Sequence, residues 1–522
     1  MAWRDLRRRA SLIKPAVRAA TSARLTPPVV PWRGVQLALE LLTRGVSPSI
    51  GWAGGAARHP RQIALIDTDG QRWTFAQAEA LTLSCTHRLR EAGLEPGTTA
   101  AILGRNSGGF ALAMASISRT GADLVYLNPG FTEPQLQAMI DDRGIKLVLA
   151  DAALAPRLPE GTPTWLLDDL ASRSVGAPAD LTKSPGGRHV ILTSGTTGKP
   201  KGADRSRTPL EATVSLLAAL PFRQGSTHVM AAPMFHAWGW MNHRLAGLLD
   251  VTEVMLTRAS ATDILDAVED HRARIVVTTP VAVGRLAEEC PGERDLSCLE
   301  GVLVSGSLLG PDVVTRFLDA FGPVLYNVYG STEAGPTTCA SPEDLAADPS
   351  TAGRPLPGVD IRVLDDQGRP LGAGQIGEIW AGSPIAFDGY VDGTDSKRES
   401  GLLTLGDQGL IDFEGRLKVV GRDDDLIICG GENVHPAEVE TVLQQHPEIA
   451  DVVAVGIADE TFGQVVAAHV VPADPDAEPD ALAARIQDWA AERLAPYQRP
   501  KKVVVRDTIP RNELGKVQRR LL

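Results

Sequence analysis

Ten residues, Thr193–Gly202, read TSGTTGKPKG and combine clustered hydroxyl groups with three glycines and two lysines. Bare backbone amides and hydroxyl groups of this kind can surround a polyanion, to which Lys199 and Lys201 add positive charge. The stretch is not a Walker A loop, because that motif has four residues between its first glycine and its Gly-Lys pair. Only two residues separate Gly195 from Gly198. The stretch therefore predicts a phosphate-binding loop of another kind.

The position of this loop in the chain supports a ligand site. It directly follows an apolar strand predicted over His189 to Thr193, and a second polar stretch, YNVYGSTEAG over Tyr326 to Gly335, directly follows another predicted strand. Ligands of α/β proteins bind beyond the carboxyl ends of strands. We therefore expect the two loops to converge on one ligand.

Strands that alternate with helices must position these loops. Thr74 with Gln77, and Thr132 with Gln135, form capping boxes ahead of two predicted helices. Short apolar runs between helical stretches predict parallel sheets covered on both faces, which is a doubly wound α/β fold. The predicted strands read TAAIL, LVYL, KLVLA, HVILT, VTEVML, RIVVTT, GVLVS and PVLYNVYG.

The pattern changes twice toward the carboxyl end. Glycine-punctuated short strands between about residues 351 and 420 predict an antiparallel β subdomain, and a small α+β domain follows the charged segment GRDDD. We expect a basic amino-terminal arm at residues 1–50, a large domain at residues 51–421, and a small mobile domain at residues 422–522.

Composition excludes several classes of function. The chain has 522 residues and a net charge of −12, which argues against nonspecific nucleic-acid binding. Its five scattered cysteines fit a reducing compartment and neither a disulfide framework nor a zinc site. We therefore expect a cytoplasmic protein with no membrane span, and composition leaves its oligomeric state open. The arginine-rich arm leaves three alternatives: contact with a membrane surface, packing on its own or a second subunit, and an organellar transit peptide.

Four motifs in register resemble the adenylate-forming superfamily, which includes acyl-CoA synthetases, luciferases and peptide-synthetase adenylation domains. The resemblance runs from about residue 55 to the end of the chain. The motifs are TSGTTGKPKG, NVYGSTEAG, LGDQGLIDFEGRLKVVGRDDDLIICGGENVHPAEVE and PRNELGKVQRR.

Such a set of residues could support carboxylate activation. A carboxylate is a poor electrophile, and its attack on the α-phosphate of ATP makes an acyl adenylate from which a thiol can displace AMP. In-line displacement at phosphorus needs charge neutralisation and alignment more than covalent help from the protein.

The resemblance implies a role for each matching position. The glycine-rich loop would hold the β- and γ-phosphates, Thr196 and Glu333 would bind magnesium, and Tyr329 would stack on adenine. Asp407 would bind the ribose, although Leu405 replaces the threonine that the family usually has two residues before it. The implied nucleotide and CoA contacts are Thr193, Ser194, Gly195, Thr196, Thr197, Gly198, Lys199, Gly306, Ser307, Tyr329, Gly330, Thr332, Asp407, Arg422, Gly430 and Gly431.

The resemblance also implies a moving lysine. Lys516 would bridge the substrate carboxylate and the α-phosphate during adenylation, and the small domain would then rotate about Asp424 to bring Gly430 and Gly431 to the site for thiol attack. His236 would lie at the junction of the acyl pocket and the thiol channel. Trp238 and Trp240 would line the acyl pocket.

These observations predict an ATP- and Mg²⁺-dependent enzyme that converts a medium- or long-chain fatty acid, or another carboxylic acid, to an acyl-CoA. Two alternatives stay open at this stage. The acyl group could pass to a carrier protein or another acceptor, or the chain could be a catalytically silent homologue that binds acyl or adenine ligands.

Overall fold

The computed structural model describes residues 48–172, 187–193, 201–204, 210–384, 386, 398–399, 401–422, 427–429, 432–459, 462–512 and 515–522, together with residues 15, 21 and 23. Most of the basic arm predicted at residues 1–50 lies outside the described residues, as does the predicted hinge residue Asp424. None of the helices in the described ranges has the length and apolar character needed to cross a bilayer.

The N-terminal sheet has the strand order β6–β5–β3–β4–β7–β8, with parallel pairing up to β7 and antiparallel pairing of β7 with β8. Its outer face packs against α7 (Glu133–Arg143). The strands are β3 (Thr99–Leu103), β4 (Asp123–Leu127), β5 (Ile145–Ala150), β6 (Thr164–Leu166), β7 (His189–Thr193) and β8 (Lys201–Asp204).

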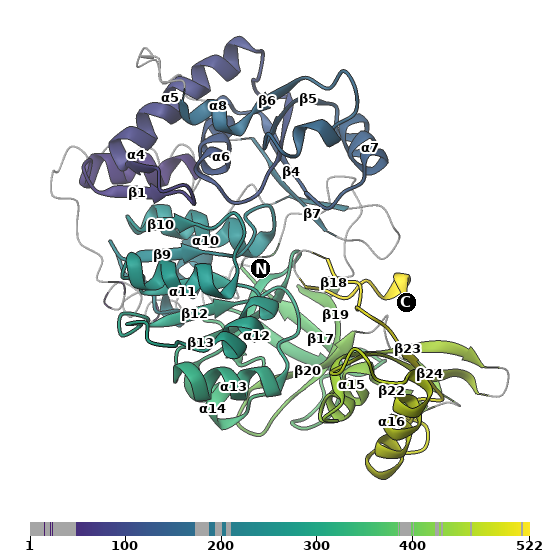
Figure 1. Cartoon of the computed structure of the whole chain (residues 1–522). Coiled ribbons are helices and arrows are strands. Elements are labelled where there is room, and N and C mark those ends of the chain that lie inside the picture. Colours follow the sequence, from purple (N-terminus) through teal and green to yellow (C-terminus); the bar gives the residue numbers. More distant parts are fainter. Residues whose placement is uncertain are drawn as a thin grey trace.

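The central sheet has the order β15–β14–β13–β12–β11–β9–β10–β1–β2 and is parallel from β13 to β1. It shares one hydrophobic core with the N-terminal sheet, and Figure 1 shows the two sheets stacked with helices between them. The strands are β1 (Ile63–Ile66), β2 (Arg72–Thr74), β9 (Thr227–Met230), β10 (Thr252–Met255), β11 (Ile275–Thr278), β12 (Gly301–Val304), β13 (Leu325–Ser331), β14 (Gly335–Ala340) and β15 (Arg354–Pro355).

Helices cover both faces of these sheets, as the sequence predicted. Thr74 caps its helix through the predicted box with Gln77, and Gln135 accepts a hydrogen bond from the backbone of Thr132. The helices around the shared core are α4 (Pro48–Arg58), α5 (Phe75–Glu91), α6 (Gly108–Thr120), α8 (Leu167–Ser172), α9 (Leu210–Ala219) and α10 (Ala237–Leu248). On the far face of the central sheet lie α11 (Ala261–Asp270), α12 (Pro280–Glu289), α13 (Pro311–Phe321) and α14 (Pro342–Ala347).

The predicted β subdomain is present and antiparallel, with the order β16–β17–β19–β18 and with β20 paired to β19. Its strands are β16 (Asp360–Leu364), β17 (Gly377–Gly382), β18 (Arg398–Glu399), β19 (Leu402–Ile411) and β20 (Leu417–Arg422). The chain then enters the small α+β domain, drawn in yellow-green in Figure 1. That domain contains β21 (Ile427–Cys429), β22 (Glu432–Val434), α15 (Pro436–Gln444), β23 (Ile449–Asp459), β24 (Gly463–Pro472), α16 (Pro479–Arg493) and β25 (Lys502–Val505).

Two details differ from the sequence-based expectations. The predicted strand PVLYNVYG is present as β13, but this strand runs to Ser331, so the loop that was expected to begin at Tyr326 consists only of the residues after Ser331. In addition, Lys201 begins the short strand β8, which returns antiparallel to β7. The polar sequence KGAD has no apolar alternation, so only pairing with β7 reveals it as a strand.

Gly353 is required where the central sheet meets the β subdomain. Its φ is +85°, and an added Cβ would lie 2.0 Å from the backbone nitrogen of Ala340. Gly401 has nearly the same φ, +84°, but has nothing within 4 Å of an added Cβ. Both glycines would be strained by a side chain, but only at Gly353 would the side chain also collide with a neighbour. Comparing substitutions at the two positions therefore distinguishes the cost of backbone strain from the cost of the close contact.

We expect Gly353→Ala to lower the free energy of unfolding by about 2–5 kcal/mol, because strain and overpacking add, and Gly401→Ala by about 1 kcal/mol. Urea unfolding followed by tryptophan fluorescence measures both changes. Equal losses in the two variants would mean that the contact with Ala340 contributes nothing.

Candidate functional site

The candidate site lies along the carboxyl ends of adjacent parallel strands. In the central sheet β13, β12, β11 and β9 are neighbours, so the segments that follow them emerge at one edge. Tyr329 and Gly330 lie near the carboxyl end of β13 itself, and the segments after β12, β11 and β9 carry Gly306 and Ser307, Val281, and His236, respectively. The fold thus brings together predicted residues that are far apart in the sequence.

Tyr329 and Glu333 belong to a tight hairpin formed by β13 and β14. The ladder shifts register between Tyr329 and Gly330, and an added Cβ at Gly330 would lie 2.1 Å from the oxygen of Gly335. The hydroxyl of Thr337 donates to the carbonyl of Tyr329 over 3.0 Å. Glu333 follows the end of β13 and therefore lies in the turn that closes the hairpin, beside Thr332.

Asp407 and Tyr329 are in direct contact. The hydroxyl of Tyr329 donates to Oδ2 of Asp407 over 2.5 Å, although the two residues come from different sheets. Asp407 pairs directly with Arg422 in the β19–β20 ladder. An aromatic ring beside a carboxylate, with an arginine on the neighbouring strand, matches what a nucleoside needs: a stacking surface and an acceptor for its hydroxyl groups.

His236 is the N-cap residue of α10, and its Nε2 is enclosed without a hydrogen-bond partner among the described residues. Burial lowers the pKa of His236 to about 3. The imidazole is therefore neutral at physiological pH. It can donate or accept a hydrogen bond, but it carries no positive charge.

Asn106 holds the segment that leads to His236, and sequence reasoning did not identify it. Its buried amide donates to the carbonyls of Met230 and Ala232 over 3.1 and 2.9 Å and accepts from the nitrogen of Met234 over 2.8 Å. Because Asn106 follows β3 and Met230 ends β9, this contact joins the carboxyl edges of the two stacked sheets.

The buried residues behind the site form a hydrogen-bonded chain. The indole of Trp240 donates to the hydroxyl of Tyr126 over 3.0 Å, that hydroxyl lies 2.7 Å from Nδ1 of His189, and Nε2 of His189 lies 2.9 Å from the hydroxyl of Ser118. Burial lowers the pKa of His189 to about 3. This neutral chain fixes β7, from which the glycine-rich loop emerges. Trp238 is also buried, and its indole donates to the carbonyl of Thr278.

The turn that carries Lys516 rests against the large domain. An added Cβ at Gly515 would lie 1.9 Å from Cγ2 of Val281, in the first turn of α12. Within the turn, the side chain of Asn512 accepts from the nitrogen of Lys516 over 2.8 Å, and Arg511 donates to the carbonyl of Gly515 over 3.0 Å. The small domain therefore presents Lys516 close to the carboxyl end of β11.

Several predicted site residues cannot be placed in the same way. Ser194, Gly195, Thr196, Thr197, Gly198 and Lys199 lie outside the described residues, as do Gly430 and Gly431. Thr193 and Arg422 end β7 and β20, respectively. Gly306, with a φ of +111°, and Ser307 follow β12 as predicted.

Comparison with known proteins identifies the family. Residues 53–391 match the family described as AMP-binding enzyme, and residues 438–516 match the AMP-binding enzyme C-terminal domain. The chain belongs to this adenylate-forming family. Its mixed α/β fold, with a large domain of parallel sheets and a small carboxyl-terminal domain, is that of adenylate-forming enzymes.

Three similar proteins illustrate the range of substrates. A fatty acid–[acyl-carrier-protein] ligase, ScoC, of Streptomyces coeruleorubidus is 29% identical over 89% of this chain and 94% of its own. A long-chain-fatty-acid–CoA ligase, FadD13, of Mycobacterium tuberculosis is 30% identical over 91% and 98%. The solved o-succinylbenzoate CoA synthetase of Bacillus subtilis in complex with ATP and magnesium has a TM-score of 0.78, at 28% identity over 90% and 98%.

The described residues fit the way magnesium binds with a nucleotide. Within the ranges that the structure describes, no group of three or more His, Cys, Asp or Glu side chains could hold a metal ion. Magnesium in ATP-dependent enzymes needs only one or two carboxylates besides the phosphates. The oxygen of Glu333 fits that role, and ATP, magnesium and CoA are the cofactor set of this family.

Tyr329→Phe tests the contact between the aromatic ring and the carboxylate. We expect the KM for ATP to rise about three- to tenfold with a smaller change in kcat, because Asp407 loses one charge-assisted hydrogen bond in a partly exposed place. Tyr497→Phe removes a hydroxyl from an exposed tyrosine of the small domain and serves as the control. An unchanged KM for ATP in Tyr329→Phe would contradict the assignment.

Proposed function

We propose that the chain activates a medium- or long-chain fatty acid as an acyl adenylate and transfers the acyl group to CoA, with release of pyrophosphate and AMP. The observation that supports this most is that strands of two sheets bring Tyr329 to Asp407 while the Lys516 turn rests on α12. This arrangement favours a nucleoside site and a mobile cation at one edge of the central sheet.

In the first half-reaction a carboxylate oxygen attacks the α-phosphorus of ATP, and the bond from that phosphorus to the bridging oxygen of pyrophosphate breaks. Lys516 contacts both anions and offsets the charge that builds on the α-phosphate. Asp407 accepts hydrogen bonds from the ribose, Tyr329 stacks on adenine, and Arg422, Gly306 and Ser307 complete the nucleoside contacts. The glycine-rich loop, Ser194 to Lys199, holds the β- and γ-phosphates with its amides and hydroxyl groups.

Glu333 and Thr196 are the residues that we assign to magnesium, which when bound supplies charge neutralisation at the phosphates. Glu333 contributes a carboxylate oxygen at the tip of the β13–β14 hairpin. Its neighbours there are weaker candidates, since Gly330 offers only backbone groups and Thr332 adds only a hydroxyl. The hairpin therefore depends on Glu333 for a charged oxygen ligand.

In the second half-reaction the thiol sulfur of CoA attacks the acyl carbonyl, and the bond from that carbon to the AMP oxygen breaks. Lys516 obstructs this step from its first position. We infer that the small domain, residues 422–522, rotates about Asp424 against the large domain, residues 51–421, so that Gly430 and Gly431 approach the site and admit the pantetheine arm. Neutral His236 lies where the acyl carbonyl and the thiol meet.

The proposal names a fatty acid as the substrate and CoA as the acyl acceptor. Trp238 and Trp240 follow His236 on α10 and are buried, and we assign them to the acyl site, where their apolar rings would favour a hydrocarbon chain. Two similar proteins represent the competing alternatives. The carrier-protein ligase represents a protein as the acyl acceptor, and the o-succinylbenzoate synthetase represents an aromatic acid as the substrate.

Pyrophosphate release from a panel of acids tests the substrate. We expect saturated acids of medium and long chain to react faster than short, branched or aromatic acids at equal concentration. An aromatic acid that reacts faster would overturn the fatty-acid assignment. Adenylate that accumulates with CoA present but is consumed by a phosphopantetheinylated carrier protein would instead overturn CoA as the acceptor.

A further inference from the structure

We propose that a polar network joining α14 and β15 to the β19–β20 hairpin positions the nucleoside site, by setting how far Asp407 stands from Tyr329. This inference rests on the proposed nucleotide site. It adds Asp348, Arg354 and Lys418 as positioning residues, although none of them was singled out as a site residue from the sequence.

The network closes a ring of paired backbone segments. Tyr329 lies on β13, which pairs with β14, and β14 pairs with β15. Gly353, just before β15, forms an antiparallel bridge with Leu417 at the start of β20, and β20 pairs with β19, which carries Asp407. The hydrogen bond from Tyr329 to Asp407 completes the ring. Any shift at the Gly353–Leu417 junction must therefore appear at that hydrogen bond or in the strand pairing.

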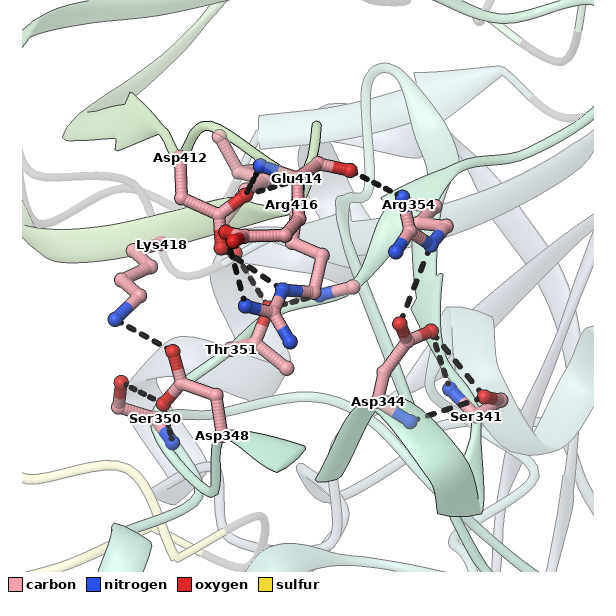
Figure 2. A network of polar contacts seen from close by, with 12 residues as sticks. Ser341, Asp344, Asp348, Ser350, Thr351, Arg354, Asp412, Glu414, Arg416 and Lys418 are labelled. Carbon is pink, nitrogen blue, oxygen red and sulfur yellow. Dashed lines mark hydrogen bonds and ion pairs between the residues drawn. The ribbon is translucent and has the colours of Figure 1, made fainter. Parts of the chain in front are cut away.

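Side chains reinforce the junction from both directions, as Figure 2 shows. The ammonium of Lys418 lies 2.5 Å from Oδ2 of Asp348, at the end of α14. The guanidinium of Arg354 donates to Asp344 over 3.2 Å and also to the carbonyl of Glu414, in the turn of the hairpin. Two cations, one from each side, thus connect the central sheet to the β19–β20 hairpin.

The hairpin itself is braced where these contacts reach it. Arg416 donates from its Nε to Oδ2 of Asp412 over 2.8 Å, and Oδ1 of Asp412 accepts from the backbone nitrogen of Arg416 over 2.8 Å. The hydroxyl of Thr351 donates to the carbonyl of Leu417 over 3.1 Å. These contacts brace the turn, and we infer that a displacement at Lys418 is carried along the paired strands β20 and β19 to Asp407.

Burial and charge suit a positioning role. Burial raises the pKa of Asp348, but hydrogen bonds from Lys418 and Ser350 outweigh it and bring that pKa below its ordinary value, so the carboxylate is ionised. The side chains of Lys418 and Asp348 are 33% and 18% exposed, so their pairing adds little to global stability. The apolar core inside the ring, which includes Ala352, Leu405 and Leu417, supplies most of the cohesion. Directional polar contacts instead fix the register and angle of β20.

The same strand ends at Arg422, immediately before the segment that contains the proposed hinge. Because Lys418 anchors β20, the small domain would rotate about the end of a strand that is held in place. The network should therefore affect nucleoside binding more than binding of the phosphate groups, whose predicted loop follows β7 of the N-terminal sheet.

Lys418→Met in the full-length protein tests this inference. We expect the Kd for AMP, measured by calorimetry, to rise about tenfold, because a displaced β20 would move Asp407 out of alignment with the nucleoside. The inhibition constant of pyrophosphate should stay within about twofold. Lys418→Arg, which keeps the charge, should restore most of the affinity for AMP. Asp348→Asn removes the negative charge of the same ion pair and should therefore have the same effect as Lys418→Met.

Arg223→Met is the matched control. Arg223 is 34% exposed and pairs with Glu300 over 3.1 Å. It lies in the segment that precedes β9, an interior strand of the central sheet, and thus at the amino-terminal ends of the parallel strands, opposite the ends that carry the candidate site. Thermal unfolding should shift similarly in Arg223→Met and Lys418→Met, and only Lys418→Met should weaken AMP binding. An unchanged Kd for AMP in both Lys418→Met and Asp348→Asn, or a parallel loss of pyrophosphate binding, would overturn the positioning role. Direct AMP binding by the unmodified protein, without any acid turnover, would leave this inference standing even if the proposed substrate is wrong.

Discussion

Lys516→Ala is expected to slow adenylate formation by about 100- to 1,000-fold while the reaction of preformed acyl adenylate with CoA changes by less than about threefold. The lysine is the only proposed cation that bridges the carboxylate and the α-phosphate, and it serves one arrangement of the domains. Single-turnover pyrophosphate release and thioester formation from synthetic acyl-AMP measure the two steps separately.

Two further variants make this prediction specific. Lys502→Ala removes an exposed lysine of the same domain and should leave both half-reactions unchanged. Gly515→Ala keeps the lysine but adds a Cβ that would strike Val281, so it should also slow adenylation selectively. Equal losses in the two half-reactions of Lys516→Ala would contradict the assignment of Lys516 to adenylation alone.

Glu333→Gln has the second largest expected effect. Replacing the carboxylate by an amide removes the charged oxygen proposed to bind magnesium, and we expect adenylation to slow by about 100-fold or more. The magnesium concentration that gives half-maximal rate should rise as well. Initial rates over a magnesium titration measure both effects.

The control for this prediction is Glu288→Gln, at an exposed position on α12. Its rate and its magnesium dependence should match those of the unmodified protein. If Glu333→Gln slowed adenylation with no change in the magnesium dependence, Glu333 would act through the shape of the hairpin and not through the metal.

Much of the fold followed from local patterns. Apolar runs such as His189–Thr193 and the Thr74–Gln77 capping box are determined by residues next to one another, and both are present as predicted. The alignment of strand ends at one edge of the central sheet also followed, because parallel strands align their carboxyl ends. The order of the motifs indicated the family, and the resemblance to that family supplied the expected role of each matching residue.

Other features depend on residues that the sequence keeps apart. Asn106 contacts backbone groups 124 and 126 residues away, and a single asparagine after a strand carries no sign of such partners. The pairing of Lys418 with Asp348 likewise joins two charged residues that read as ordinary surface positions. Such contacts arise from packing between sheets, which periodicity does not encode.

Transfer of oxygen from the acid to AMP tests the central claim most directly. With the carboxylate labelled by ¹⁸O, an attack on the α-phosphorus of ATP places one labelled oxygen in AMP after the thioester has formed. The account predicts this label in AMP and none in pyrophosphate. Label that appears in inorganic phosphate, together with ADP as the other product, would show activation through an acyl phosphate and would contradict the account.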